Sequence, residues 1–69
     1  MIEVGEYIRT EKGEIDKVKE TCKHEAFIKK FYRFYNMRML EDEEIEKTIV
    51  KHSKNIIDLI EVRRFSKWV

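Results

Sequence analysis

The sequence has no proline, only two glycines and a single cysteine among its 69 residues. Because Cys22 is alone, no disulfide can form within the chain, and a reducing compartment is expected. Gly5 and Gly13 are too far apart for a phosphate-binding loop, which needs closely spaced glycines ahead of a helix. No apolar run approaches the roughly 18 residues of a membrane span, and Glu3 and Glu6 interrupt any signal peptide. These absences predict a cytoplasmic protein that has no membrane partner.

A chain this short forms one domain at most, which we place at residues 1–69. Hydrophobic residues make up 42%, enough for a core, but charged residues also reach 42%, well above the usual quarter. The charges nearly cancel at +1, yet they are clustered: residues 23–38 carry a balance of +4, and residues 41–46 hold five acids. Such clusters are typical of solvated faces that attract each other within a fold. They also suit a basic face for nucleic acid, or an acidic patch that imitates it.

The residues that usually carry chemistry are few. Cys22, His24 and His52 are the only Cys or His residues, whereas a structural zinc site needs about four ligands. No nucleophile and base have a spacing that is typical of a catalytic motif, and a chain this short has little room for a water-excluding pocket. We therefore predict no enzyme activity, no metal and no cofactor. His52 is expected to be half-buried and satisfied by a neighbouring carbonyl or carboxylate.

The first third of the chain predicts a β-hairpin. Residues 4–10 mix β-branched and aromatic residues with charges, and residues 14–18 return as a second strand. Between them Gly13 supplies a residue able to adopt positive φ in a tight turn. Residues 21–25 are polar and are predicted to be a connection.

Five of the eight aromatic residues lie in residues 27–35 (FIKKFYRFY), so we expect the core to form around this segment. On a helix its apolar side chains fall within roughly 160°, with Lys29, Lys30 and Arg33 on the far side. On a strand both faces mix apolar and charged residues, although the aromatic content favours a strand. Periodicity therefore favours a helix, with a strand as the alternative.

The acids of residues 41–44 predict a helix start, because negative charge is stabilised near the N-terminal end of a helix. Behind them an apolar stripe recurs at helical spacing: Ile45, Ile49, His52, Ile56 and Leu59. One helix over residues 42–61 accounts for this stripe. Two shorter pieces are the alternative, because Ser53 is a favourable N-cap.

Two blocks of the sequence resemble a family of small phage and prophage proteins from low-GC Gram-positive bacteria. They are residues 4–10 (VGEYIRT) with Gly13, and residues 49–62 (IVKHSKNIIDLIEV), which together cover about a third of the chain. The first block also resembles the VGDxVR…G opening of small SH3-like β-barrels. The family has no established activity, so the resemblance implies a phage setting and assigns no functional residue.

Two details of the family bear on the fold. Relatives often carry proline at the position of Lys54, which implies a break near Ser53 and a short helix over residues 55–60. Relatives also continue after Val62 with a GDYVNG-type strand, which residues 63–69 do not match. The features together predict an α+β fold, with an N-terminal antiparallel hairpin (a small SH3-like sheet or partial barrel) packed with one or two helices from the second half. A β-hairpin plus a helical hairpin is the alternative.

The leading functional prediction is a phage-encoded, non-enzymatic accessory protein that binds a host, defence or phage protein. An inhibitor such as an anti-CRISPR protein is one form of this protein-binding role. Homodimerisation through the apolar stripe is a simpler form of it. A protein of this size can present an interface of about 800 Å². The predicted contact is the acidic group Glu41, Asp42, Glu43, Glu44 and Glu46.

A small nucleic-acid-binding β-barrel module is the alternative function. Basic and aromatic residues interleave in a way that suits phosphate contacts and base stacking: Lys29, Lys30, Arg33, Tyr32, Tyr35, Arg63, Arg64, Lys67 and Trp68. The net charge of only +1 argues against it, since nucleic-acid affinity depends on neutralising phosphates.

Overall fold

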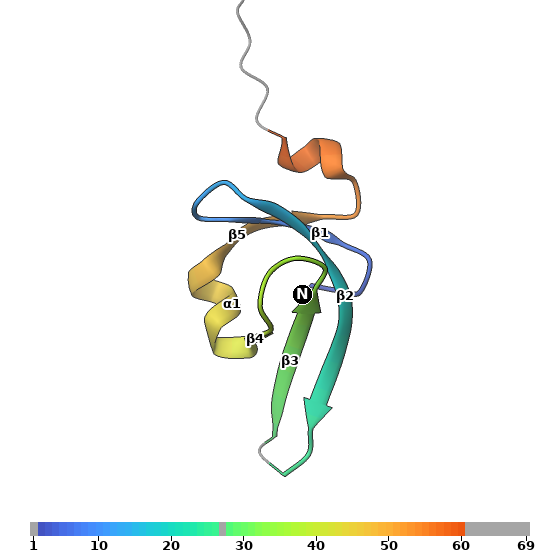
Figure 1. Ribbon diagram of the computed structural model, residues 1–69, viewed down its shortest axis with the longest axis vertical. Coiled ribbons are helices and arrows are strands. Elements are labelled where there is room, and N and C mark those ends of the chain that lie inside the picture. The colour runs from blue at the N-terminus through green and yellow to red at the C-terminus, as the bar shows by residue number, and fades with distance from the viewer. Residues whose placement is uncertain (1, 27, 61–69) are drawn as a thin grey trace, which may run out of the picture.

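The computed structural model describes residues 2–26 and 28–60. Their elements follow in the order β1 (Tyr7–Thr10), β2 (Ile15–His24), β3 (Lys29–Phe34), β4 (Leu40–Glu41), α1 (Asp42–Thr48), β5 (Ile49–Ser53) and the 3-10 helix η1 (Ile56–Leu59). The five strands of this described part join in one antiparallel sheet in the order β4-β3-β2-β1-β5 (Figure 1). The predicted combination of an N-terminal hairpin, sheet and helix is confirmed in outline, whereas the helical hairpin of the alternative is wrong.

The predicted β1–β2 hairpin is confirmed. Its turn is closed by the N–H of Gly13, which donates to the carbonyl of Thr10 at 2.9 Å, and Gly13 has a φ of +86°. The Thr10 hydroxyl oxygen accepts the N–H groups of Lys12 and Glu14 at 3.2 and 3.1 Å. The buried Thr10 thus accepts hydrogen bonds from two N–H groups of the turn that would otherwise need water as a partner.

β2 is the longest strand and belongs to both halves of the sheet. Residues 15–17 pair with β1, and residues from Val18 to His24 pair with β3. The register shifts between Val18 and Glu20, so β2 carries an irregularity where it passes from one partner to the other. Figure 1 shows β2 leaving β1 and running down beside β3 as a projecting arm. The prediction of a connection over residues 21–25 is wrong for residues 21–24, which are strand.

The prediction of a helix over residues 27–35 is wrong, because Lys29–Phe34 form β3. Phe27 lies outside the described residues. The mixed strand faces are accommodated by their neighbours: Tyr32 and Phe34 enter the core, and Arg33 pairs with Glu20 of β2 at 3.0 Å. Cross-strand partners on β2 therefore outweigh a helical periodicity that was present in the sequence.

The second half contains a helix, a strand and a 3-10 helix instead of one long helix. α1 begins in the predicted acidic segment, where the Glu44 side chain accepts the N–H of Glu41 at 3.3 Å. It ends at the β-branched pair Ile49 and Val50, and β5 then pairs antiparallel with β1. The continuous helix over residues 42–61 is wrong. A separate short helix follows Ser53, as η1, but its N-cap is Asn55 instead of Ser53, and the first helix already ends at Thr48.

The core lies where the two halves of the sheet face each other, with α1 beside it (Figure 1). It consists of one apolar cluster: Ile2, Ile8, Val18, Tyr32, Phe34, Leu40 and Ile49. Leu59 is buried outside this cluster, on η1, which contacts β1 and β5. Because Ile56 is exposed while Ile49 and Leu59 are buried on different elements, the predicted apolar stripe is not one face. The surface predicted for homodimerisation is therefore wrong as well.

Candidate protein-binding groove

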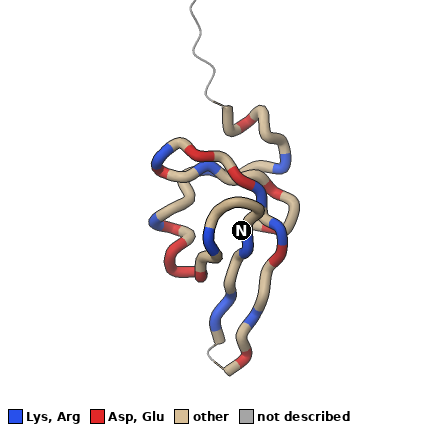
Figure 2. Tube along the Cα trace, viewed as in Figure 1, with Lys and Arg blue, Asp and Glu red and all other residues tan. Residues whose placement is uncertain are grey.

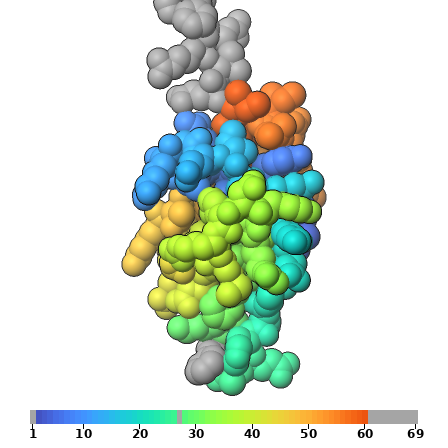
Figure 3. All heavy atoms as spheres, in the orientation of Figure 1, coloured from blue at the N-terminus to red at the C-terminus, as the bar shows by residue number. Residues whose placement is uncertain are grey.

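A groove runs along the surface where the β1–β2 turn faces the loop of residues 35–39, which joins β3 to β4. Two hollows form it, of about 640 Å³ and about 300 Å³. Ile15, Asp16 and Asn36 line both hollows, so the two adjoin. Figure 3 shows the blue β1–β2 turn above the lime-green loop on the visible face. We call the smaller hollow the tyrosine end of the groove and the larger one its turn end.

Asp16 fixes the loop that forms one wall of the groove. Asp16 is only 5% exposed, and its carboxylate accepts the N–H of Asn36 at 3.0 Å and the N–H of Met37 at 2.7 Å. It also accepts the N–H of Lys17 at 2.8 Å. A carboxylate that satisfies several backbone donors holds them in a fixed geometry. Asp16 is thus a positioning residue for the groove.

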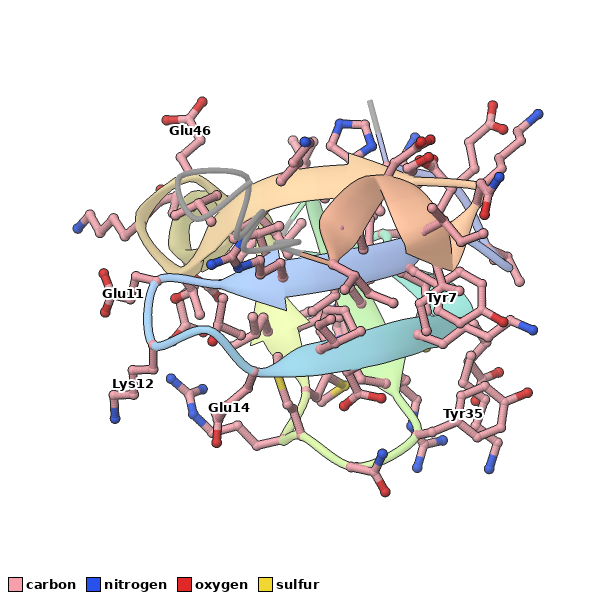
Figure 4. All side chains as sticks on the ribbon, turned by 90° about the horizontal axis from the view of Figure 1, so that it is seen from above. Tyr7, Glu11, Lys12, Glu14, Tyr35 and Glu46 are labelled. Atoms are coloured by element: carbon pink, nitrogen blue, oxygen red, sulfur yellow. The ribbon has the colours of Figure 1, made fainter. Side chains whose placement is uncertain are left out.

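The tyrosine end joins two rings from different elements, the half-buried Tyr7 and the exposed Tyr35. Tyr7 comes from β1, and Tyr35 follows β3 and is 59% exposed. The N–H of Tyr35 donates to the carbonyl of Lys17 at 3.2 Å, which ties it to β2. Figure 4 shows both tyrosines on the same side of the molecule. Ile15 and Ile56, both partly exposed, add aliphatic surface to the lining.

A lysine ammonium lies against each tyrosine ring. Lys17, the direct cross-strand partner of Tyr7, places Nζ 5.2 Å from the centre of its ring. Lys19 places Nζ 5.7 Å from the centre of the Tyr35 ring. Such cation–π contacts hold flexible lysines close to the surface. The tyrosine end therefore combines aromatic surface with positive charge.

The turn end has a different charge. Glu11, Lys12 and Glu14 line it and project away from the β1–β2 turn, at the opposite side of the view from the tyrosines (Figure 4). Arg38 also lines this hollow, but its guanidinium donates to Glu44 at 2.7 Å. The charge of the turn end is therefore set by Glu11, Glu14 and Lys12, which together carry a net negative charge.

The acidic residues predicted as a protein contact lie together at the start of α1, and none of them lines the groove. Glu41 is 3.6 Å from the Lys29 ammonium, and the hydrogen bond from Arg38 lowers the pKa of Glu44. The remaining three are exposed: Asp42, Glu43 and Glu46, the last of which points away from the body in Figure 4. Part of the predicted acidic patch is thus neutralised within the fold, and its role as a contact stays a prediction.

The residues predicted for nucleic-acid binding do not form one free basic face. Lys29 pairs with Glu41, and Arg33 pairs with Glu20. Lys30 places Nζ 5.2 Å from the Tyr32 ring centre, a contact that leaves its charge unneutralised. Tyr32 is buried, so it offers no open ring face to a base, while Tyr35 belongs to the groove. Figure 2 shows basic and acidic residues interspersed along the trace. The other four lie outside the described residues: Arg63, Arg64, Lys67 and Trp68.

The expectation for His52 is confirmed in its carboxylate partner but not in its burial, because the side chain is 39% exposed. Its Nδ1 lies 2.7 Å from Oε1 of the buried Glu6, whose Oε2 accepts the N–H of Glu3 at 2.6 Å. Burial raises the pKa of Glu6, but the hydrogen bonds from His52 and Glu3 outweigh it, so the pKa of Glu6 lies below its ordinary value. The pair links β5 to the start of β1 and lies outside the groove.

Sequence reasoning missed most of the groove. Tyr35 was assigned only to nucleic-acid binding and Ile56 only to the apolar stripe, and Tyr7, Ile15 and Asp16 were assigned no binding role. One signal was available, because Asp16 stands two positions from Val18 and so shares its inward face in a strand. An acid on the buried face of a strand indicates a carboxylate with specific donors.

Comparison with protein-family models, with curated proteins and with solved structures gives no match. The resemblance to small phage proteins therefore stays a prediction. Within residues 2–26 and 28–60, no three His, Cys, Asp or Glu side chains are grouped to hold a metal ion. No helix of that part is long and apolar enough to cross a membrane.

Proposed function

We propose that the chain is a non-enzymatic accessory protein, encoded by a phage, that acts in the bacterial cytoplasm by binding another protein through the groove. The target is a host, defence or phage protein, and inhibition of a defence system, as by an anti-CRISPR protein, is one form of this action. The observation that carries the proposal is the pair of the half-buried Tyr7 and the exposed Tyr35 beside one hollow, where the buried Asp16 fixes the loop that follows Tyr35.

Physical reasons favour a protein contact at this surface. Tyrosine is enriched at protein interfaces because it offers a large amphipathic surface with few rotatable bonds. The loop that carries Tyr35 is already fixed by Asp16, so less conformational entropy is lost on binding. Partly exposed Ile15 and Ile56 line the same hollow as the rings and supply further apolar area.

We also infer that the sheet is an SH3-like partial barrel. Three observations support this inference: β2 pairs with both β1 and β3, its register shifts midway, and β5 returns to pair with β1. Such an arrangement leaves loops and a turn free to carry a binding surface on a rigid support. The groove lies between one such loop and the β1–β2 turn.

Affinity capture with matched variants tests the proposed function. The immobilised chain is incubated with lysate of a low-GC Gram-positive bacterium, with and without nuclease, beside the variants Tyr35→Ala and Val50→Ala. Tyr35 and Val50 have nearly equal exposure, 59% and 60%, but only Tyr35 lines the groove. We expect a protein that the wild type and Val50→Ala retain after nuclease treatment and that Tyr35→Ala loses. Equal capture by both variants, or capture that nuclease abolishes, contradicts the proposal.

A further inference from the structure

The charge along the groove changes sign between its two ends. Lys17 and Lys19 flank the tyrosine end, whereas Glu11 and Glu14 outnumber Lys12 at the turn end. Ile15 lines both hollows and lies between them. We infer that the groove binds an extended segment of the partner protein, an inference that rests on the proposed function. In that segment an acidic residue lies at the tyrosine end, an apolar side chain lies over Ile15 and a basic residue lies at the turn end.

The tyrosine end suits a carboxylate next to an apolar group. The ammonium groups of Lys17 and Lys19 lie 5.2 and 5.7 Å from the ring centres, so they stay beside the rings. A carboxylate placed there receives charge-assisted hydrogen bonds from ammonium donors and can accept from a tyrosine hydroxyl. The rings themselves cover the apolar atoms of the same segment.

The turn end suits a cation. Its other charged groups are already engaged, because Arg38 donates to Glu44 and the Asp16 carboxylate accepts backbone N–H groups of the loop. Glu11 and Glu14 flank Lys12 and Gly13 in the sequence, and Figure 4 shows the side chains of Glu11, Lys12 and Glu14 extending from the turn. A lysine or arginine of the bound segment meets a net negative charge there, and complementarity of this kind fixes the direction of binding.

The change of sign also separates this partner from a nucleic acid. A single strand carries a phosphate at every nucleotide, so a strand lying along the groove would pass Glu11 and Glu14 as well as the lysines. A protein segment can match both ends because its charge varies from residue to residue. The groove therefore favours a peptide whose two ends differ in charge.

Selection from a displayed library of random 12-residue peptides tests the inference. The baits are the full chain, the variant Lys17→Glu/Lys19→Glu, the variant Glu11→Lys/Glu14→Lys and the control Lys47→Glu/Lys51→Glu, whose lysines are exposed outside the groove. Amide spectra of each bait establish that it is folded. We expect the wild type and the control to enrich peptides that run from acidic through apolar to basic residues, in one chain direction or the other.

The charge variants give the decisive comparison. Peptides selected by the wild type should bind Lys17→Glu/Lys19→Glu roughly tenfold more weakly, and a reselected pool should lose only its acidic preference. Glu11→Lys/Glu14→Lys should lose only the basic preference. Enriched peptides without a charge order, or the same peptides on all four baits, overturn the inference, as does a failure to enrich any peptide.

The proposed function has a separate outcome. If the lysate partner is still captured in a Tyr35-dependent way while the peptide selection shows no charge order, the groove binds protein by other chemistry and only the inference fails. An oligothymidine that shifts the Tyr7 and Tyr35 amide signals, with loss of this shift in Lys17→Glu/Lys19→Glu, overturns both. The two results are therefore distinguishable.

Discussion

The two ends of β2 share a backbone conformation but not their surroundings. Near its start, Asp16 and Val18 are buried, with β1 on one side and the loop of residues 35–39 on the other. Toward its end, residues 22–24 are exposed and pair with β3 alone in the projecting arm. Ladder hydrogen bonds are enough to keep the arm a strand. At the start of β2, burial and satisfied polar groups also fix the geometry of the groove surface.

The largest expected effect separates a buried from an exposed isoleucine. Ile8 is 0% exposed in the core, and Ile8→Ala should lower the free energy of unfolding by about 2–5 kcal/mol, because it removes apolar contacts and leaves a cavity. Ile28, beside the tip of the arm, is 86% exposed and has a φ of +54°, which disfavours a β-branched residue. Ile28→Ala should therefore be neutral or slightly stabilising. Urea unfolding measures both, and equal losses would contradict the comparison.

The next effect concerns the carboxylate that fixes the groove. Asp16→Asn should lower the free energy of unfolding by about 1–3 kcal/mol, because the buried Asp16 carboxylate accepts the N–H groups of Asn36 and Met37 and an amide accepts them less well. Amide exchange of these two groups should accelerate by more than that of the arm. Asp58→Asn is the control, since Asp58 is exposed and accepts a hydrogen bond from the Ser53 hydroxyl. Unchanged exchange at Asn36 and Met37 would mean that Asp16 does not position the loop.

The pH dependence of stability compares a buried acid with an exposed one. The pKa of Glu6 is lower in the folded chain than its ordinary value of 4.5, so its carboxylate stabilises the fold above that value. This stabilisation is lost as the pH falls through the lower, folded value. Glu6→Gln should flatten the fall in stability on acidification. Glu44→Gln should change it less, because the Arg38–Glu44 pair is exposed and screened. Identical slopes for Glu6→Gln and the wild type would contradict this.

The smallest effect is expected in the arm. Arg33 and Glu20 form an ion pair of 3.0 Å between exposed side chains. Arg33→Ala should cost only about 0.2–1 kcal/mol, and raising the salt concentration should reduce the difference from the wild type further. Thermal unfolding at low and high salt measures it. If Arg33→Ala lowered the free energy of unfolding as much as Asp16→Asn, the arm would contribute as much to stability as the groove end.

The parts of the fold that depend on neighbours in sequence were predictable. Gly13 with its flanking polar residues specifies the hairpin turn, and the acids of residues 41–44 specify the start of α1. The length of α1 was not predictable, because Ile49 and Val50 fit either a helical stripe or a strand. What decides between them is pairing with β1, about 40 residues earlier in the chain.

The same reasoning explains β3 and the groove. A helical period and a strand with mixed faces were both present in residues 27–35, and the partner β2 selects the strand. The groove is made by three segments that are distant in the sequence, so neither Tyr7 nor Tyr35 alone indicates it. His52 was predictable because a histidine among apolar residues needs a polar partner, although the identity of Glu6 was not.

Hydrogen exchange of the chain with and without the captured protein tests the central claim, that the groove and not the arm or the acidic start of α1 is the contact. We predict slower amide exchange at residues 15–17 and 35–38 on binding, with no change at residues 22–24 of the arm. Slower exchange confined to the arm, or to residues 42–46 of α1, with the groove unaffected, would contradict it.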